Sequence, residues 1–337
     1  MNIPLSLAPN QRTIVAVGSA LMDICIFESA EFVAGSGARV GGMVMTDHTN
    51  IEELVARSSG KPHVVPGGSA CNTAVGVGRL GGSARFVGKR GSDTLGQALA
   101  EHIAAAGVEP VLLLSPTATG RVLSIITPNA QRSMLTYLGA SADIKPENII
   151  PSHFDGCAVA HVEGYLLFNP DIFRAVIKTA RSAGALVSLD LASFNVVEAS
   201  LPLLNEAVDS GAVDILIANE EEAAAFTGLK DEEKAADALR KRAPIAVMKL
   251  GKRGSVIMHG GCTVNTPPHG DGRPAVDTTG AGDLWASGFL YGLINGYPLE
   301  RCGTLASMCG YEVCQVAGAH IPKDGWDRIK EYVAGRR

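Results

Sequence analysis

Short apolar runs that alternate with helix-like stretches restrict the fold of this sequence more than any other feature. Buried strands are predicted at 13–19, 83–91, 156–167, 185–191, 213–219 and 244–251. Helices are predicted over 70–81, 96–108, 170–184 and 219–228; apolar residues recur with helical spacing in 170–184, and 219–228 begins with acidic residues, as a helix N-terminus prefers. Because the strands are apolar on both faces, this order predicts an α/β fold of three layers, with a mostly parallel central sheet covered by helices.

Two segments break this alternation. Residues from about 24 to 64 are rich in glycine and loops. Within about 111–140, alternating residues flank a turn at Pro128 and Asn129, which is typical of a β-hairpin. We therefore expect a small β-sheet lid, built from these two pieces of chain, on a single α/β domain that spans residues 1–337.

Composition excludes several classes of function. The formal net charge of −5 leaves no basic excess to bind a nucleic-acid backbone. No apolar run reaches the about 18 residues of a membrane-spanning helix, and the first residues lack the pattern of a secretory signal. Seven scattered cysteines without a Cys-x-x-Cys pair are typical of reduced thiols. We expect a cytoplasmic protein that binds neither nucleic acid nor membranes.

Residues 76–81 fit the G-x-G-x-x-G pattern of dinucleotide-binding proteins. That pattern belongs between a strand and the helix that follows it, whereas these glycines lie inside the helix predicted over 70–81. Close helix packing explains them better, and an oxidoreductase that binds a nicotinamide cofactor is kept as an alternative. Residues 88–93, "GKRGSD", lack the spacing of a Walker A loop.

The stretch "DTTGAGD", Asp277 to Asp283, comes just before an apolar run long enough for a helix. A helix N-terminus presents unpaired N–H groups and favours anions, and Gly280, Ala281 and Gly282 would let phosphate oxygens approach the backbone. Asp283, in the first turn, could accept a proton from an attacking hydroxyl group. These residues fit phosphoryl transfer, but a glycine-rich loop with an acidic first turn explains them equally well without a function.

"DTTGAGD" resembles the C-terminal signature of the ribokinase-like (PfkB-type) sugar and nucleoside kinases. Other elements resemble motifs of the same family and occur in the family's order: "GSALMD" (18–23), "GGSACNTAVGVGRLGG" (67–82), "NEEE" (219–222) and "KLGKRG" (249–254). Together they extend over about residues 13–320, which is nearly the whole chain. The resemblance implies a ribokinase-like fold and an ATP-dependent kinase that uses Mg²⁺.

The resemblance also implies roles at the phosphate end. Asp283 would be the general base, and the backbone N–H groups of Gly280, Ala281 and Gly282 would form an anion hole for the γ-phosphate. The base would take the proton of a primary hydroxyl group as that group attacks the γ-phosphorus.

Other matching residues would serve the nucleotide and the cations. Asn219 and Glu222 would organise Mg²⁺ through water, although alone they would be an ordinary helix start. Three residues would line the nucleotide side: Lys249, Gly251 and Gly254. Backbone oxygens near Asp277 and Thr279, with others near 316–318, would hold a monovalent cation such as K⁺, as in some relatives.

At the acceptor end, Asp23 would bind two neighbouring sugar hydroxyls, because one carboxylate can accept two O–H bonds. The resemblance places these further residues there: Gly67, Gly68, Ser69, Asn72 and, on the lid hairpin, Arg132. Taken one at a time, the same residues fit plain structural roles, such as a strand end, a turn, a helix start and a solvated arginine.

The acceptor is expected to be a nucleoside, adenosine first, with its 5′-hydroxyl as the attacking group. "ALMD" (20–23) is closer to the Leu-Leu-Asp of adenosine kinases than to the Asn-x-Asp of ribokinases, and "RSMLTYLGAS" (132–141) resembles adenosine-kinase-like bacterial members. Leu21 or Met22 would line an apolar wall. The candidates to stack on a base are Tyr137, Tyr165 and Phe168.

Two alternatives are kept beside this interpretation. One is a sugar kinase of the same family, acting on fructose, ribose or 2-keto-3-deoxygluconate. The other is a ligand-binding protein on the kinase scaffold that catalyses nothing. The resemblance also leaves open whether the lid forms the interface of a homodimer.

Overall fold

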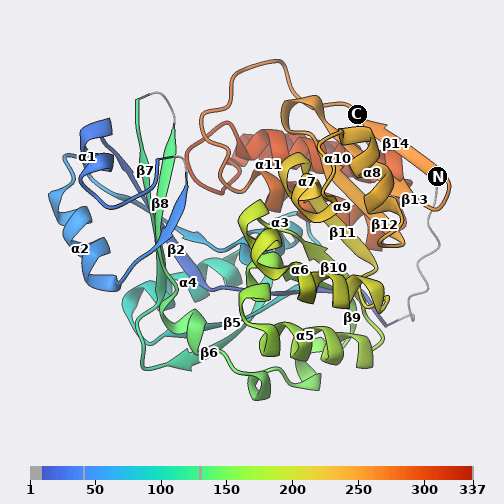
Figure 1. Cartoon of the computed structure of the whole chain (residues 1–337), viewed down its shortest axis with the longest axis horizontal. Helices are drawn as coiled ribbons and strands as arrows, with labels where there is room; N and C mark the ends of the chain where they lie inside the picture. The colour runs from blue at the N-terminus through green and yellow to red at the C-terminus, as the bar shows by residue number, and fades with distance from the viewer. Residues whose placement is uncertain (1–9, 41, 129–130, 336–337) are drawn as a thin grey trace.

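The computed structural model describes residues 10–40, 42–128 and 131–335. Figure 1 shows a small sheet with two short helices on the left, beside a larger layered part on the right. The large sheet has the strand order β14-β13-β12-β11-β10-β9-β1-β5-β6, and the small sheet has the order β3-β8-β7-β2-β4. The predicted fold class, a mostly parallel sheet between helices with a small sheet as lid, is confirmed.

The large sheet is parallel from β6 to β12 and turns antiparallel at one edge. Its strands are β1 (Thr13–Val17), β5 (Ala84–Gly91), β6 (Val108–Ser115), β9 (Cys157–Glu163), β10 (Leu186–Asp190), β11 (Ile215–Asn219), β12 (Ile245–Lys249), β13 (Ser255–His259) and β14 (Cys262–Thr266). All six strands predicted from the sequence are present. The hairpin β13–β14 was not predicted.

Helices cover both faces of the large sheet because its strands bury side chains in both directions. In β11, Leu216 and Ala218 pack with α5 (Pro170–Ser182), α6 (Phe194–Asp209), α7 (Glu220–Thr227) and α8 (Glu232–Arg240). The alternate residues Ile215 and Ile217 pack in the layer of α3 (Ser69–Arg79), α4 (Thr94–Ala105), α9 (Ala281–Ile294) and α10 (Leu299–Val313). The last helix, α11 (Lys323–Val333), packs on α10.

The small sheet has its own apolar core. It consists of β2 (Leu21–Phe27), β3 (Met43–Met45), β4 (His63–Gly67), β7 (Gly120–Ile126) and β8 (Arg132–Tyr137). Ile24, Leu123 and Leu135 pack against Ile51 and Leu54 of α2 (His48–Arg57), and the short α1 (Ala30–Ala34) adds Val33.

The lid differs from its prediction in two respects. The segment 24–64, expected to be rich in loops, contains the helices α1 and α2. Residues 111–115, expected in the lid, belong to β6, which pairs with β5 in the large sheet. The hairpin β7–β8 is present, and its turn residue Asn129 lies outside the described residues.

The glycines of the G-x-G-x-x-G pattern lie within or at the end of α3, as expected for packing. A Cβ atom on Gly76 would collide with Ser287 of α9, and one on Gly78 would collide with the carbonyl oxygen of Ala106. These glycines therefore let α3 approach its neighbours closely. All seven cysteines are free thiols. Within the described ranges, no helix has the length and apolar character needed to cross a membrane.

Candidate active site

Neighbouring strands of the large sheet end on polar side chains. β9 ends on Glu163, β10 on Asp190, β11 on Asn219 and β12 on Lys249. The register pairs Glu163 with Asp190 and Asn219 with Lys249, so the four residues lie along one edge and on the face covered by α3 and α9. Open α/β sheets bind ligands at this edge, outside the carboxyl ends of parallel strands.

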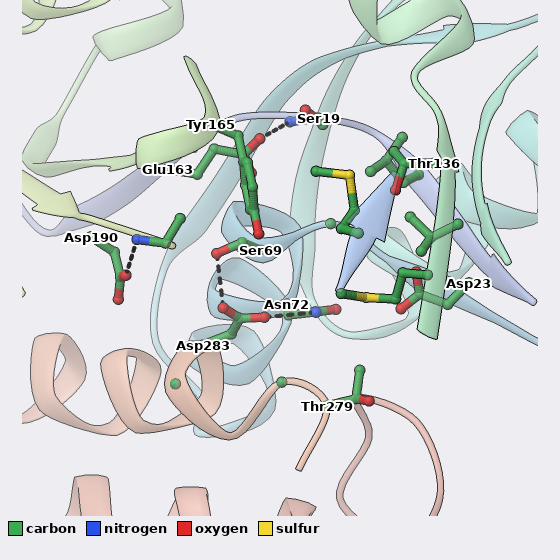
Figure 2. A pocket seen from close by; sticks show the side chains of 18 of the residues that line it. Ser19, Asp23, Ser69, Asn72, Thr136, Glu163, Tyr165, Asp190, Thr279 and Asp283 are labelled. Carbon is green, nitrogen blue, oxygen red and sulfur yellow. Dashed lines mark hydrogen bonds between the residues drawn. The ribbon is translucent and has the colours of Figure 1, made fainter. Parts of the chain in front are cut away.

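A cavity of about 640 Å³ opens at this edge of the sheet. Its walls come from the ends of β9 to β12, from the start of α3, from the first turn of α9 and from the inner face of the lid. Figure 2 shows Asp283, Ser69, Asn72, Glu163 and Asp190 grouped around it. Residues from distant parts of the chain therefore converge on a single site.

The carboxylate of Asp283 lies in the first turn of α9 and is held from α3. Ser69 Oγ donates to its Oδ1 at 2.8 Å, and Asn72 Nδ2 donates to its Oδ2 at 2.9 Å (Figure 2). Burial raises the pKa of Asp283, while the hydrogen bonds from Asn72 and Ser69 oppose that rise. A buried carboxylate with a raised pKa and a fixed orientation is suited to accept a proton.

The N-terminus of α9 has no side-chain cap. Its N-cap residue, Gly280, has φ 74°, and a Cβ there would lie 2.5 Å from the Cβ of Ala319, so glycine is required. The N–H of Ala281, expected from the resemblance to be part of the anion hole, instead donates to the Thr278 carbonyl at 3.2 Å, which closes a turn. Within the described part of the chain, the N–H groups of Gly282 and Asp283 have no acceptor. The N–H of the N-cap residue Gly280 also has no acceptor there, so three unpaired donors lie at the cavity beside the carboxylate.

Lys249 and Asp190 form an ion pair beside this turn, with 2.8 Å between Nζ and Oδ2. Burial opposes ionisation of both groups, but their mutual attraction outweighs it. The pKa of Asp190 is therefore lowered and that of Lys249 is raised. Both residues are charged at neutral pH.

Asn219 and Glu222 form a closed capping box at the start of α7. The Glu222 carboxylate accepts from the backbone N–H of Asn219 and from its Nδ2, both at 2.8 Å, while the Glu222 N–H donates to the Asn219 side chain at 2.8 Å. Burial raises the pKa of Glu222 to about 7, with Lys249 opposing the rise. Both residues line the cavity, and helix capping alone accounts for their spacing.

Asp23 reaches the cavity from the lid strand β2. Burial raises its pKa to about 7, although Arg132 acts in the opposite direction. A Cβ on Gly67 would lie 2.5 Å from the Asp23 carboxylate, so glycine makes room for that side chain. Gly68, with φ 97°, is the N-cap residue of α3 and lines the cavity.

Arg132 links the lid to the loop that precedes α9. Its Nη1 donates to Thr279 Oγ1 and lies 3.9 Å from Asp277 Oδ1. Asp277 in turn accepts from the N–H of Thr279 at 3.0 Å and from the N–H of Gly318 at 2.9 Å. The segment 277–279 therefore lies next to Gly318.

Glu163 was not singled out from the sequence. Its carboxylate accepts from the N–H groups of Ser19, at 2.8 Å, and Ala70, at 3.0 Å, so it ties the end of β1 to the start of α3 (Figure 2). Burial raises its pKa to about 7 against these hydrogen bonds. Both Glu163 and Asp190 end parallel strands, and that position is the signal that could have identified them.

Most of the residues selected from the sequence line the cavity. Among the residues assigned to the base, the anion hole, the nucleotide, the cations and the acceptor's sugar, four do not: Gly67, Gly251, Gly254 and Asp277. Gly251 and Gly254 flank the turn between β12 and β13, where Gly254 has φ 96° and a Cβ would collide with the carbonyl of Thr266. The requirement for glycine at 254 is therefore local.

The lid contributes an apolar wall to the cavity, made of Leu21, Met43, Met45, Val122 and Met134. Tyr165 and Phe168 line it from the other side. Tyr137 and Met22, the alternative to Leu21, do not contribute, because side chains alternate along a strand. Tyr137 points the other way from Met134 and packs on His48, with ring centroids 5.6 Å apart, and Met22 lies in the main core.

Comparison with known proteins agrees with this geometry. The model of the family described as "pfkB family carbohydrate kinase" matches residues 39–325. The structure is similar to that of an adenosine kinase from Sinorhizobium meliloti, with TM-score 0.88 and 31% identity, covering 97% of this chain and 100% of that one. It is also similar to a probable sugar kinase from Rhizobium etli CFN 42, with TM-score 0.89, 31% identity and coverage of 96% and 99%. The sequence is 28% identical to a ribokinase of Arabidopsis thaliana over 284 residues, 79% of this chain and 71% of the relative.

Proposed function

This chain belongs to the pfkB family of carbohydrate kinases, and from that premise we propose that it transfers the γ-phosphoryl group of ATP to the 5′-hydroxyl of a nucleoside, adenosine first. The observation that carries the proposal is the Asp283 carboxylate, fixed by Ser69 and Asn72 beside the unpaired N–H groups at the start of α9. A base and an anion site next to each other are what phosphoryl transfer requires.

In the proposed reaction, Asp283 accepts the proton of the acceptor's primary hydroxyl group. The hydroxyl oxygen forms a bond to the γ-phosphorus while the bond from that phosphorus to the bridging oxygen breaks, and ADP leaves with the electron pair. The N–H groups of Gly282 and Asp283 stabilise the charge on the equatorial oxygens. Arg132 keeps the lid against the loop at Thr279, which limits the access of water.

Bound Mg²⁺ would neutralise charge on the phosphates. In the described ranges, no group of three or more His, Cys, Asp or Glu side chains is placed to hold a metal. The one carboxylate and one amide of Glu222 and Asn219 at the cavity fit a Mg²⁺ that they contact through water, because Mg²⁺ keeps much of its hydration shell. We assign Asn219 and Glu222, at the edge of the cavity, to orienting such water. We assign the loop around Asp277 to a monovalent cation such as K⁺.

The preference for a nucleoside depends on two parts of the cavity wall, one charged and one apolar. Asp23 offers a carboxylate to a ribose diol, whereas Met43, Met45 and Met134 offer soft apolar surface. A nucleoside has hydroxyl groups on the sugar and a flat, largely apolar face on the base. A free sugar carries hydroxyl groups on every side, and some would lose their hydrogen bonds against this wall. A sugar is the second candidate, because Ser124 and Thr136 of the lid also line the cavity.

A panel of acceptors tests this proposal. Adenosine, inosine, fructose, ribose and 2-keto-3-deoxygluconate are each incubated with MgATP, and release of ADP and formation of the phosphorylated acceptor are measured. We expect the highest kcat/KM with adenosine. A higher value with any free sugar would favour the sugar kinase, and binding of acceptors without formation of ADP would favour a protein that only binds ligands.

A further inference from the structure

The ammonium group of Lys249 has N–H groups that make no hydrogen bond to the described residues. It carries three protons, and Asp190 Oδ2 accepts one of them at 2.8 Å. Among the described residues, no other group accepts a hydrogen bond from Nζ. The side chain is 14% exposed and lines the cavity, so its remaining protons face the space where ligands bind.

The free side of this ammonium group faces the first turn of α9. A Cβ atom on Gly282 would lie 3.0 Å from Lys249 Nζ and 3.9 Å from its Cε. The N–H of Gly282 is one of the unpaired donors in that turn. Two kinds of donor, a backbone N–H and a full positive charge, therefore converge on one small volume beside Asp283.

Asp190 is held so that it cannot turn away from Lys249. Its other oxygen, Oδ1, accepts from the N–H of Ala192 at 2.9 Å. Ala192 has φ 61°, the left-handed region that residues other than glycine rarely adopt. A non-glycine residue in this conformation must be held by its surroundings, and such positions cluster at functional sites.

Stability alone gives little reason for this ion pair. Asp190 is 5% exposed, and burying two charges costs about as much as their attraction returns. An apolar pair of similar size would pack at least as well. The arrangement is better explained by a task that needs a fixed positive charge inside the cavity.

We propose that Lys249 is a further catalytic residue, whose ammonium group contacts the γ-phosphoryl group during its transfer, and that Asp190 is the positioning residue that holds it there. The inference rests on the kinase function proposed above. Charge spreads over the equatorial oxygens in the transition state, and the ammonium group meets that charge from the side of β12 while the N–H groups meet it from α9. Lys249 stays protonated throughout, so the bonds that form and break are those of phosphoryl transfer alone.

Four variants test the proposal: Lys249→Met, Lys249→Arg, Asp190→Asn and the double variant Lys249→Met/Asp190→Asn. Two quantities are measured for each. The first is kcat and KM with MgATP and the best acceptor. The second is calorimetric affinity for MgADP, with the acceptor present, with and without aluminium fluoride, which mimics the transferring phosphoryl group.

For Lys249→Met we expect kcat to fall about 10²–10³-fold, the usual loss on removing one such donor. Affinity for MgADP alone should change by less than about threefold, because the contact exists mainly in the transition state. The extra affinity that aluminium fluoride gives the wild type should be lost. Lys249→Arg should recover part of kcat, and Asp190→Asn should lose kcat while keeping its affinity for MgADP.

The double variant separates catalysis from charge balance. If Lys249 only neutralises Asp190, removing both charges restores kcat; on our proposal, the double variant stays as slow as Lys249→Met. It also leaves no uncompensated buried carboxylate, so it should fold even if Lys249→Met does not. Arg174→Met, which breaks the exposed Arg174–Glu206 pair, is the matched control and should keep wild-type kcat.

Different results contradict the proposed function and the role of Lys249. A wild-type chain that phosphorylates no acceptor contradicts the proposed function itself. A wild-type chain that is active, with a double variant that keeps kcat within about fivefold or keeps the gain from aluminium fluoride, overturns the role of Lys249 only.

Discussion

Asn72 holds one oxygen of the Asp283 carboxylate, so replacing it by alanine tests whether that carboxylate is the base. A hydrogen bond to a charged group contributes about 1.5–3 kcal/mol. One pKa unit corresponds to about 1.4 kcal/mol, so losing this hydrogen bond raises the pKa of Asp283 further. The direction follows because the Asn72 N–H stabilises the ionised form.

The assay is the dependence of kcat/KM on pH, from about pH 5 to about pH 9, because this profile reports the pKa of the free enzyme's essential base. A base must be ionised, so activity is present above its pKa and is lost as the pH falls through it. We expect the acid limb of Asn72→Ala to lie about 1–2 pH units above that of the wild type. Activity should recover in part on the alkaline side.

Thr73→Val is the matched control. Thr73 lies on the same helix, and its hydroxyl donates to the backbone carbonyl of Asp283 at 3.1 Å, not to the carboxylate. Its acid limb should coincide with that of the wild type. If Asn72→Ala also keeps the wild-type acid limb and only KM rises, the carboxylate is not the group that titrates, and the reasoning fails.

Two further predictions concern the anion site and the buried carboxyl groups. Gly282→Ala should lower kcat more than about tenfold with little change in Tm, because the added Cβ would meet only the Lys249 side chain. Gly280→Ala should instead lower the free energy of unfolding by about 1–2 kcal/mol, because φ is 74° at this position and the added Cβ would collide with Ala319. Burial raises the pKa of Glu163 from 4.5 to about 7, so the unfolded chain loses this proton first and stability should fall as the pH rises from about 5 to about 8. Urea unfolding of Glu163→Gln should show a flatter dependence on pH than the wild type; an unchanged slope would contradict this assignment.

Much of the large sheet could be predicted from the sequence because its strands are buried on both faces. A continuous apolar run such as 213–219 is typical of a parallel strand that buries side chains on both faces of a sheet. The start of α9 was also predictable, because Gly280 and Gly282 leave the backbone bare in front of a long apolar helix.

The lid was harder to predict, because its helices bury few residues. In α2 only Ile51 and Leu54 are buried, which is too few to mark a helical face among polar neighbours. The strand β6 was assigned to the lid because it directly precedes the hairpin in the sequence. Its partner is β5 of the large sheet. The residues of a strand do not by themselves determine which of two sheets the strand joins.

Site residues that belong to a sequence motif could be predicted. Site residues that only the fold brings together were missed. Asp283 and Asn72 belong to recognisable motifs, and the structure joins them by a hydrogen bond. Asp190 and Glu163 belong to no motif in this sequence and gain their importance from the strands that end beside one another. The misplacement of Tyr137 was avoidable, because strand alternation puts it on the face opposite Met134.

Asp283→Asn with MgATP and the best acceptor tests the central claim most directly. The substitution keeps the shape of the side chain and removes its ability to accept a proton, and a general base contributes about 10²–10⁴-fold to the rate. We predict that turnover is abolished while Tm stays close to that of the wild type. A folded variant that keeps more than about a tenth of the wild-type kcat would contradict the account.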